Sequence, residues 1–122
     1  RPVRKGTIWR TEIEGIRIVH MGALEGELNE AERAFCANAE VLMVPVGGHG
    51  VLSPKEAAEL VRTLEPSVVL PLYYQVEGLK DPREDIERFV KELPCPQERS
   101  DKISLRRSDI PSEGMKMYII TL

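Results

Sequence analysis

The sequence predicts a layered α/β domain whose elements follow the order ββαβαβαββ. Two continuous apolar runs, Val41–Val46 and Val68–Leu72, are typical of strands buried on both faces of a parallel sheet. A capped helix pattern lies between them, and a strand–helix–strand unit of this length predicts a right-handed parallel crossover. A hairpin signal precedes the unit, and a further helix and two short strands follow it. With 122 residues, a single domain spanning residues 1–122 is expected.

The chain begins with a hairpin pattern. Thr7–Ile13 and Ile16–Met21 are short β-prone runs joined by Glu14-Gly15, a two-residue X-Gly connection that favours a hairpin turn. Side chains alternate between the two faces of a strand, and neither face of the second run is wholly polar. We therefore expect both faces of this strand to be at least partly covered.

Three capping signals predict three helices. In each, a capping side chain is followed three residues later by an acid that closes a capping box, and in two of them proline stands at the first helical position. The signals are Asn29 with Glu32, Ser53 with Pro54 and Glu56, and Asp81 with Pro82 and Glu84. Apolar residues follow at helical spacing: Leu28, Ala31, Ala34 and Phe35 in the first helix; Ala57, Leu60, Val61 and Leu64 in the second; Ile86, Phe89, Val90 and Leu93 in the third.

The last part of the chain predicts two short strands. Lys102–Arg107 and Met115–Leu122 flank a turn region at Asp109–Gly114. No internal repeat, low-complexity tract or domain linker interrupts this order.

Composition excludes several classes of function. A net charge of −3 provides no basic surface for nucleic acid. The longest apolar runs fall far below the roughly 20 residues that span a bilayer, so no membrane association is expected. Cys36 and Cys95 are far apart and show no CxxC spacing. Without a visible signal peptide, two free thiols in a reducing cytoplasm are the favoured interpretation.

A candidate site lies where the two buried strands end, because ligands of open α/β sheets bind at the carboxyl ends of strands. Gly47, Gly48 and His49 follow the first strand, and Tyr73 and Tyr74 follow the second. These five residues are the candidate ligand-binding residues. No catalytic residue is identified with confidence from the sequence.

Four stretches resemble the C-terminal half of the metallo-β-lactamase superfamily, in the branch of small metal-dependent hydrolases related to ascorbate-6-phosphate lactonases. Gly6–Met21 resembles the strand pair before that branch's metal loop, and Gly22–Leu28 resembles the loop itself. Pro45–Ala57 resembles the Pro-Val-Gly-Gly loop with its following helix, and Pro71–Tyr74 resembles the Pro-Met-His-Tyr strand end. The resemblance implies one half of an αββα sandwich, with a mixed sheet that carries helices on one face.

The resemblance also identifies which metal-site positions have changed. Ala23 stands where the family has an aspartate that bridges two metals, Gly26 holds the place of a loop histidine, and Tyr73 replaces a histidine ligand. The family's His-x-His-x-Asp-His motif belongs to the half that these residues do not include. Zinc needs several imidazole, thiolate or carboxylate donors that converge. We therefore expect no zinc or other cofactor, unless a missing segment supplies ligands.

Each polar candidate also has a structural interpretation, and we favour that one. His49 is then an exposed loop histidine instead of a ligand or base, and His20 is half-buried and hydrogen-bonded. Gly47-Gly48 is a turn that needs positive φ angles, not an anion cradle. Tyr73 and Tyr74 are buried in a core or interface. Glu25 and Glu27 are solvated loop acids.

One half of a sandwich leaves an apolar sheet face that must be covered. We expect a homodimer in which two copies pack sheet to sheet, or else a covering partner segment. The favoured function is that of a degenerate hydrolase-like domain, non-catalytic on its own, which acts through assembly or ligand binding. The alternative is the C-terminal portion of a hydrolase whose metal-binding half comes from a missing N-terminal segment or a partner chain.

Overall fold

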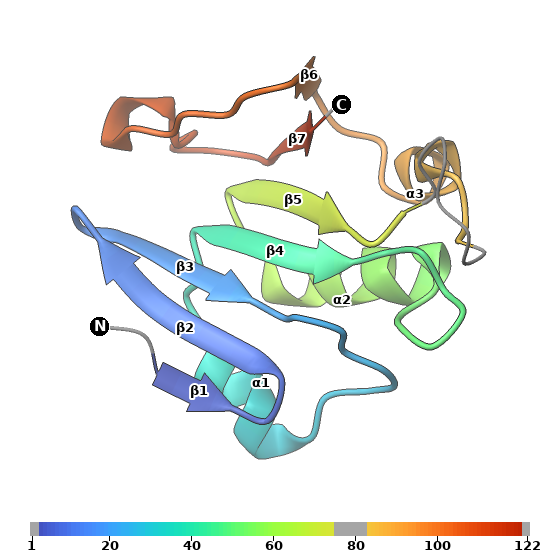
Figure 1. Cartoon of the computed structure of the whole chain (residues 1–122). Coiled ribbons are helices and arrows are strands. Elements are labelled where there is room, and N and C mark those ends of the chain that lie inside the picture. The colour runs from blue at the N-terminus through green and yellow to red at the C-terminus, as the bar shows by residue number, and fades with distance from the viewer. Residues whose placement is uncertain (1–2, 75–82, 121–122) are drawn as a thin grey trace.

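The computed structural model describes residues 3–74 and 83–120 (Figure 1). Within these residues the chain forms one seven-stranded sheet, three α-helices and one short 3-10 helix. The strands are β1 (Val3–Lys5), β2 (Ile8–Ile13), β3 (Ile16–His20), β4 (Val41–Pro45), β5 (Val68–Leu72), β6 (Gln97–Ser100) and β7 (Lys116–Ile120). The helices are α1 (Glu30–Cys36), α2 (Pro54–Leu64), α3 (Ile86–Glu92) and the 3-10 helix η1 (Arg107–Asp109).

The sheet is mixed, as predicted, and its strand order is β1-β2-β3-β4-β5-β7-β6. β3, β4, β5, β7 and β6 run parallel to one another, whereas β2 runs antiparallel to both of its neighbours. β4 is therefore the central strand, with three strands on each side. β1 is an additional strand that the sequence pattern did not predict.

The predicted hairpin is confirmed. Glu14 and Gly15 join β2 to β3, and both have positive φ angles, 51° and 79°. This pair of left-handed residues is the backbone of a type I′ turn, whose twist matches that of the paired strands.

The predicted crossover β4–α2–β5 is also confirmed, with β4 and β5 parallel. Ser53 caps α2: its side chain accepts from the Glu56 backbone N–H at 3.2 Å, and the Glu56 carboxylate accepts from the Ser53 N–H at 2.9 Å. The hydrogen bond from the Ser53 backbone holds the pKa of Glu56 below its usual value. Glu65 then ends the helix in a left-handed conformation, immediately before Pro66.

Replacing Ser53 with alanine is expected to lower the free energy of unfolding by about 1 kcal/mol, because the Glu56 N–H loses its capping acceptor. Urea unfolding followed by circular dichroism measures this change. Glu59→Ala, at an exposed position of the same helix, is the control and is expected to change stability by less than about 0.5 kcal/mol. Equal losses in the two variants would contradict the capping role.

All three helices pack against one face of the sheet, as the resemblance implied. Their buried side chains Cys36, Ala57, Val61 and Phe89 belong to the same cluster as Leu42 at the centre of the sheet. The predicted stripe of α1 is partly wrong, because Ala31 and Ala34 are exposed and Cys36 is buried.

Both cysteines are free, as predicted. Burial raises the pKa of Cys36 to about 11 and that of Cys95 above its ordinary value, so neither thiol has the reactive thiolate character of a nucleophile. Among the described residues, no helix has the length and apolar character needed to cross a membrane.

The C-terminal part differs from the sequence prediction in two places. Asp81 and Pro82 lie outside the described residues, and α3 begins only at Ile86, where the Asp85 side chain accepts from the Glu87 N–H at 3.0 Å. The predicted strand Lys102–Arg107 is wrong.

The sixth strand is instead the polar segment Gln97–Ser100, which lacks an apolar signal because it lies at the edge of the sheet. Two of the residues that were predicted to form this strand instead cover one face of the sheet. Ile103 and Leu105 pack onto the sheet face opposite the helices, without joining the hydrogen-bonded ladder.

Candidate functional site

The candidate site lies at the carboxyl ends of β3, β4 and β5. These strands are adjacent and parallel, so their carboxyl ends lie side by side (Figure 1). Three segments leave the sheet there: the loop after β3, the glycine loop after β4, and Tyr73-Tyr74 after β5. Two backbone hydrogen bonds connect these segments. The Leu52 N–H donates to the Leu24 carbonyl at 3.0 Å, which joins the glycine loop to the loop after β3. The Val46 N–H donates to the Leu72 carbonyl at 2.9 Å, which joins the start of the glycine loop to the end of β5.

Gly47 is held against the end of β5. A Cβ atom at this position would lie 1.7 Å from the Tyr73 carbonyl oxygen, so no side chain fits. The Gly47 carbonyl also accepts from the Glu84 N–H at 2.7 Å. The predicted positive φ is therefore wrong for Gly47, where close backbone approach is the reason for glycine. It is correct for Gly48, which has φ 65°.

The glycine loop does not present Gly48 to an anion. Its N–H donates to the Leu52 carbonyl at 2.9 Å, which closes the loop on itself. This geometry supports the structural interpretation of Gly47-Gly48 over the anion cradle.

The two tyrosines differ in their surroundings. Tyr73 is 44% exposed and has φ 55°, which is uncommon for a residue with a side chain. Of the expected burial in a core or an interface, burial in the core is therefore wrong for Tyr73, and burial in an interface stays a prediction. Tyr74 packs against the helix-side core, and its hydroxyl donates to the Ile120 carbonyl. Burial raises the pKa of Tyr74, although the charge of Arg99 opposes the shift.

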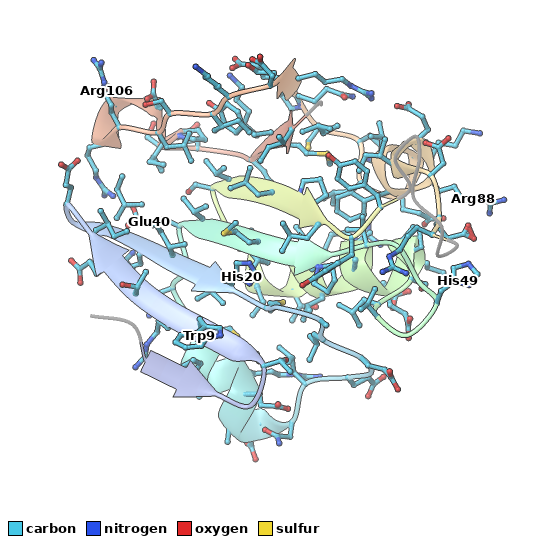
Figure 2. The ribbon with its side chains drawn as sticks, in the orientation of Figure 1. Trp9, His20, Glu40, His49, Arg88 and Arg106 are labelled. Carbon is cyan, nitrogen blue, oxygen red and sulfur yellow. The ribbon has the colours of Figure 1, made fainter. Side chains whose placement is uncertain are left out.

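His49 is exposed, as expected, and has φ 51°. It lines an open hollow of about 640 Å³ between the glycine loop and α3. Lys55, Arg88 and Lys91 contribute cations to this hollow, and Glu84 and Glu92 contribute acids. Arg88 pairs with Glu84 at 3.5 Å. Figure 2 shows His49 and Arg88 on the same side of the molecule. Sequence reasoning missed these three cations because α2 and α3 bring them together only in the folded chain.

His20 is half-buried and hydrogen-bonded, as expected: its Nδ1 accepts from the Gly22 N–H at 2.9 Å. It lies over the sheet, whereas His49 lies in the loop beyond β4 (Figure 2). The structure therefore does not bring the two histidines into a common site.

The positions that resemble metal-ligand positions carry no donors that zinc favours. Ala23 is exposed, and Gly26 is exposed with φ 78°. Glu25 and Glu27 are exposed loop acids, as expected. In residues 3–74 and 83–120, no three His, Cys, Asp or Glu side chains lie close enough to hold a metal ion together. This donor set does not fit the binuclear centre that the resemblance implies.

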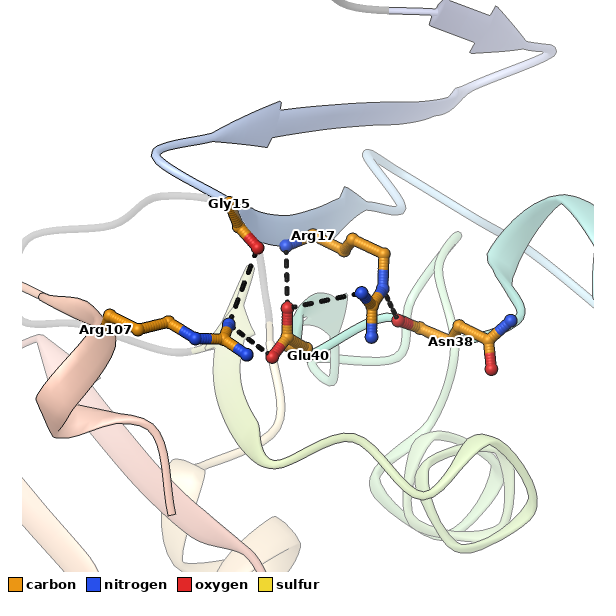
Figure 3. Close-up of polar contacts among 5 residues, drawn as sticks. All are labelled: Gly15, Arg17, Asn38, Glu40 and Arg107. Atoms are coloured by element: carbon orange, nitrogen blue, oxygen red, sulfur yellow. Dashed lines mark hydrogen bonds and ion pairs between the residues drawn. The ribbon is translucent and has the colours of Figure 1, made fainter. Parts of the chain in front are cut away.

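A charge cluster around the buried Glu40 lies at the opposite, amino ends of the strands (Figure 3), and its two arginines are more than half exposed. Glu40, whose side chain is 11% exposed, accepts from the Arg17 backbone N–H at 3.1 Å. It also pairs with the Arg107 guanidinium of η1, which reaches toward the Gly15 carbonyl. The backbone hydrogen bond from Arg17, aided by the charge of Arg107, lowers the pKa of Glu40. Its place at the amino ends favours a structural role.

Comparison with known proteins identifies relatives of this chain. A family profile described as β-lactamase superfamily domain matches residues 1–73. A UPF0173 protein of Pyrococcus furiosus is 34% identical over 82 residues, which cover 66% of this chain and 36% of that protein. A UPF0173 metal-dependent hydrolase of Thermococcus onnurineus is 33% identical over 64 residues, which cover 52% of this chain and 29% of that protein. The matched stretch is thus about a third of the length of these relatives.

Solved structures show the same fold. The crystal structure of a protein assigned as a Zn-dependent hydrolase of the metallo-β-lactamase superfamily from Thermotoga maritima superposes with a TM-score of 0.81 at 29% identity. The match covers 93% of this chain and 57% of that one. The metallo-β-lactamase fold protein YhfI from Bacillus subtilis gives a TM-score of 0.57 at 12% identity, over 98% of this chain and 49% of that one. The second likeness concerns the fold alone.

Proposed function

Because the chain belongs to the β-lactamase superfamily, whose profile matches residues 1–73, we propose that it is a degenerate hydrolase-like member that is non-catalytic on its own. It acts through assembly or by binding a small ligand at the carboxyl ends of β3, β4 and β5. The observation that carries the proposal is the donor set, because Ala23, Gly26 and Tyr73 stand at positions that resemble metal-ligand positions.

The chemistry of these residues supports the proposal. A methyl group and a glycine hydrogen cannot coordinate zinc, and a phenol must lose its proton to become a comparable ligand. Without a bound metal, nothing in the donor set activates water for hydrolysis. The hollow beside His49, at about 640 Å³, lies in the size range of small-molecule pockets and offers charges of both signs.

Metal titration tests the proposal directly. We expect the purified chain, dialysed against excess Zn²⁺ or Mn²⁺ and then against metal-free buffer, to retain far less than one metal ion per chain. We also expect no turnover of phosphodiester or lactone substrates. Stoichiometric metal accompanied by turnover would refute the proposal.

Two variants distinguish a metal centre that has lost its ligands from adventitious zinc binding at the surface. Ala23→Asp combined with Tyr73→His restores two of the donors that the resemblance implies, and it is expected to raise zinc affinity above that of the unmodified chain. His49→Ala removes an exposed imidazole. Any weak zinc binding that this substitution abolishes belongs to the loop surface and not to a catalytic centre.

A second candidate function follows from the coverage of the relatives. The match spans only 36% and 29% of two relatives, one of which is named a metal-dependent hydrolase. The chain is then the C-terminal portion of a hydrolase whose metal-binding half comes from another segment or chain. A His-x-His-x-Asp-His motif in the reading frame upstream of Arg1 would favour this candidate. Even then, Ala23 and Tyr73 leave at most a single-metal or altered site.

A further inference from the structure

The connection between β6 and β7, residues 101–115, lies on the sheet face opposite the three α-helices (Figure 1). We name this segment the strap. β6 and β7 are parallel, so the strap must run back along the sheet from the carboxyl end of β6 to the amino end of β7. The step from β6 to β7 crosses the sheet in the opposite direction from the step from β4 to β5. Right-handed crossovers in opposite directions lie on opposite faces, which explains why the strap and α2 are on different sides.

The strap lacks the internal support of an ordinary crossover. Parallel strands are usually joined by an α-helix, which makes its own backbone hydrogen bonds. Every residue of the strap is described, and its regular structure consists of the three-residue η1. The backbone hydrogen bonds of η1, from Asp109 to Arg106 and from Ile110 to Arg107, stay inside the strap. Among the described residues, no hydrogen bond between backbone groups joins the strap to another segment. Side chains therefore hold it to the sheet.

The first attachment is apolar. Ile103, Leu105 and Ile110 of the strap pack on a cluster of side chains from the sheet, and all three remain half-buried. The cluster beneath them is at most 8% exposed and consists of Ile16, Val41, Val68, Leu70 and Tyr118. Within the described part of the chain, no α-helix lies on this face, so the burial of the cluster depends on the strap.

The second attachment is an ion pair near the η1 end of the strap. The Arg107 guanidinium pairs with the Glu40 carboxylate, and its Nη1 lies 3.5 Å from the Gly15 carbonyl oxygen (Figure 3). The two partners differ in their surroundings. Glu40 is 11% exposed and also accepts from the Arg17 backbone N–H, whereas the Arg107 side chain is 60% exposed. The pair therefore joins a fixed carboxylate to a cation that water and dissolved ions reach.

An open hollow of about 600 Å³ lies beside this pair. Its lining comes partly from the strap, with Arg107, Ile110 and Ser112, and partly from the rest of the fold, with Glu40 and Ser67. The strap is therefore not packed closely against the fold at its η1 end, and solvent enters between the two.

We propose that the strap opens as a unit while the sheet stays folded, and that the Arg107–Glu40 pair is the latch that holds it closed. Opening breaks the latch and exposes the apolar cluster, but β6 keeps its pairing with β7. Segments with few attachments open at a lower free energy than the whole fold. Dissolved salt screens an exposed ion pair, so the strap opens more often as the ionic strength rises.

Thiol labelling of the whole chain tests the proposal. Val41→Cys, in a Cys95→Ala background, places a reporter thiol beneath the strap. We expect this thiol to be labelled at least about tenfold faster than the global unfolding equilibrium allows, as measured by urea denaturation. Cys36 is buried on the helix side of the sheet and gives an internal control, because strap opening does not expose it. Val68→Cys, at a second fully buried position of the cluster, repeats the measurement, and circular dichroism verifies that each variant is folded.

Two neighbouring arginines give a matched pair of variants for the latch. Arg107→Ala is expected to speed labelling of the reporter thiol about 3- to 10-fold, the range for losing a partly exposed charged hydrogen bond. Arg106→Ala removes the same kind of side chain from an adjacent exposed position and should leave the rate unchanged. Sodium chloride should speed labelling when Arg107 is present and have little effect in Arg107→Ala.

Three results would overturn the proposal. In the first, the reporter thiol is labelled no faster than global unfolding allows, so the strap does not open by itself. In the second, Arg107→Ala and Arg106→Ala change the labelling rate equally, so Arg107 is not a latch. In the third, Arg107→Ala speeds labelling of Cys36 as much as labelling of the reporter, so the substitution destabilises the whole fold. None of these measurements involves metal binding, so they stand or fall separately from the proposed function.

Discussion

Replacing Gly47 with alanine is expected to destabilise the protein by about 4 kcal/mol or more, a loss that only a few mechanisms produce. The new methyl group would lie 1.7 Å from the Tyr73 carbonyl oxygen and 2.9 Å from a side-chain carbon of Arg83. The side chain can move, but the carbonyl belongs to the end of β5. Relief of the clash therefore requires β4 and β5 to separate where the candidate site lies.

Gly26→Ala is the matched control for this substitution. Gly26 has φ 78° and no heavy atom within 4 Å of an added Cβ. The Gly26→Ala variant therefore measures only the cost of placing alanine in a left-handed backbone conformation, which is about 1–2 kcal/mol. Chemical denaturation of both variants measures the difference. If Gly47→Ala were no more destabilised than Gly26→Ala, the close approach to Tyr73 would not be the reason for glycine at position 47.

Replacing Glu40 with glutamine is expected to lower the free energy of unfolding at pH 7 by about 1–3 kcal/mol, the range for disrupting a buried hydrogen bond to a charged group. The substituted glutamine lacks the negative charge that pairs with Arg107. Of the two terminal atoms of its amide, only the oxygen can accept a hydrogen bond. Because Glu40 links the start of β4 to β3 and η1, the loss should also loosen the segment after β6.

The pH dependence of this loss follows from the sign of the pKa shift. Folding lowers the pKa of Glu40, so its stabilisation is present above the unfolded value of about 4.3. It is lost as the pH falls through the lower folded value. The difference between the unmodified chain and Glu40→Gln should therefore be constant from pH 7 to 5 and shrink below about pH 4.

Urea unfolding at several pH values measures that difference. The control Glu25→Gln lies on an exposed loop and should change stability by less than about 0.5 kcal/mol throughout. If Glu40→Gln lowered the free energy of unfolding at pH 3 as much as at pH 7, the negative charge of Glu40 would not be the source of its stabilising effect.

Much of the fold could be predicted because its signals are local. The positive-φ turn at Glu14-Gly15, the capping box of Ser53 and the apolar runs of β4 and β5 each depend on neighbouring residues. The strand β6 could not be predicted, because Gln97–Ser100 is polar and is held by pairing with β7, about 20 residues further along.

The candidate site was predictable in place but only partly in detail. The carboxyl ends of β4 and β5 follow from the parallel crossover, so the sequence placed His49 and Tyr73 at the same end of the sheet, where the structure has them. That they form a ligand site stays a prediction. The close contact at Gly47 and the cations around His49 depend on distances between segments that the sequence does not encode locally. Glu40 was missed for the same reason, since its partners Arg17 and Arg107 are 23 and 67 residues away.

The place of β7 in the sheet has a consequence for the order of folding. β7 lies between β5 and β6, although it follows both of them in the sequence. Until β7 is in place, β6 has no strand to pair with, and the β5 edge stays open. The hairpin β2–β3 and the crossover β4–α2–β5 need only nearby segments, so they can form first. Closure of the sheet by β7 is then the late step, because β6 can pair only after β7 has docked against β5.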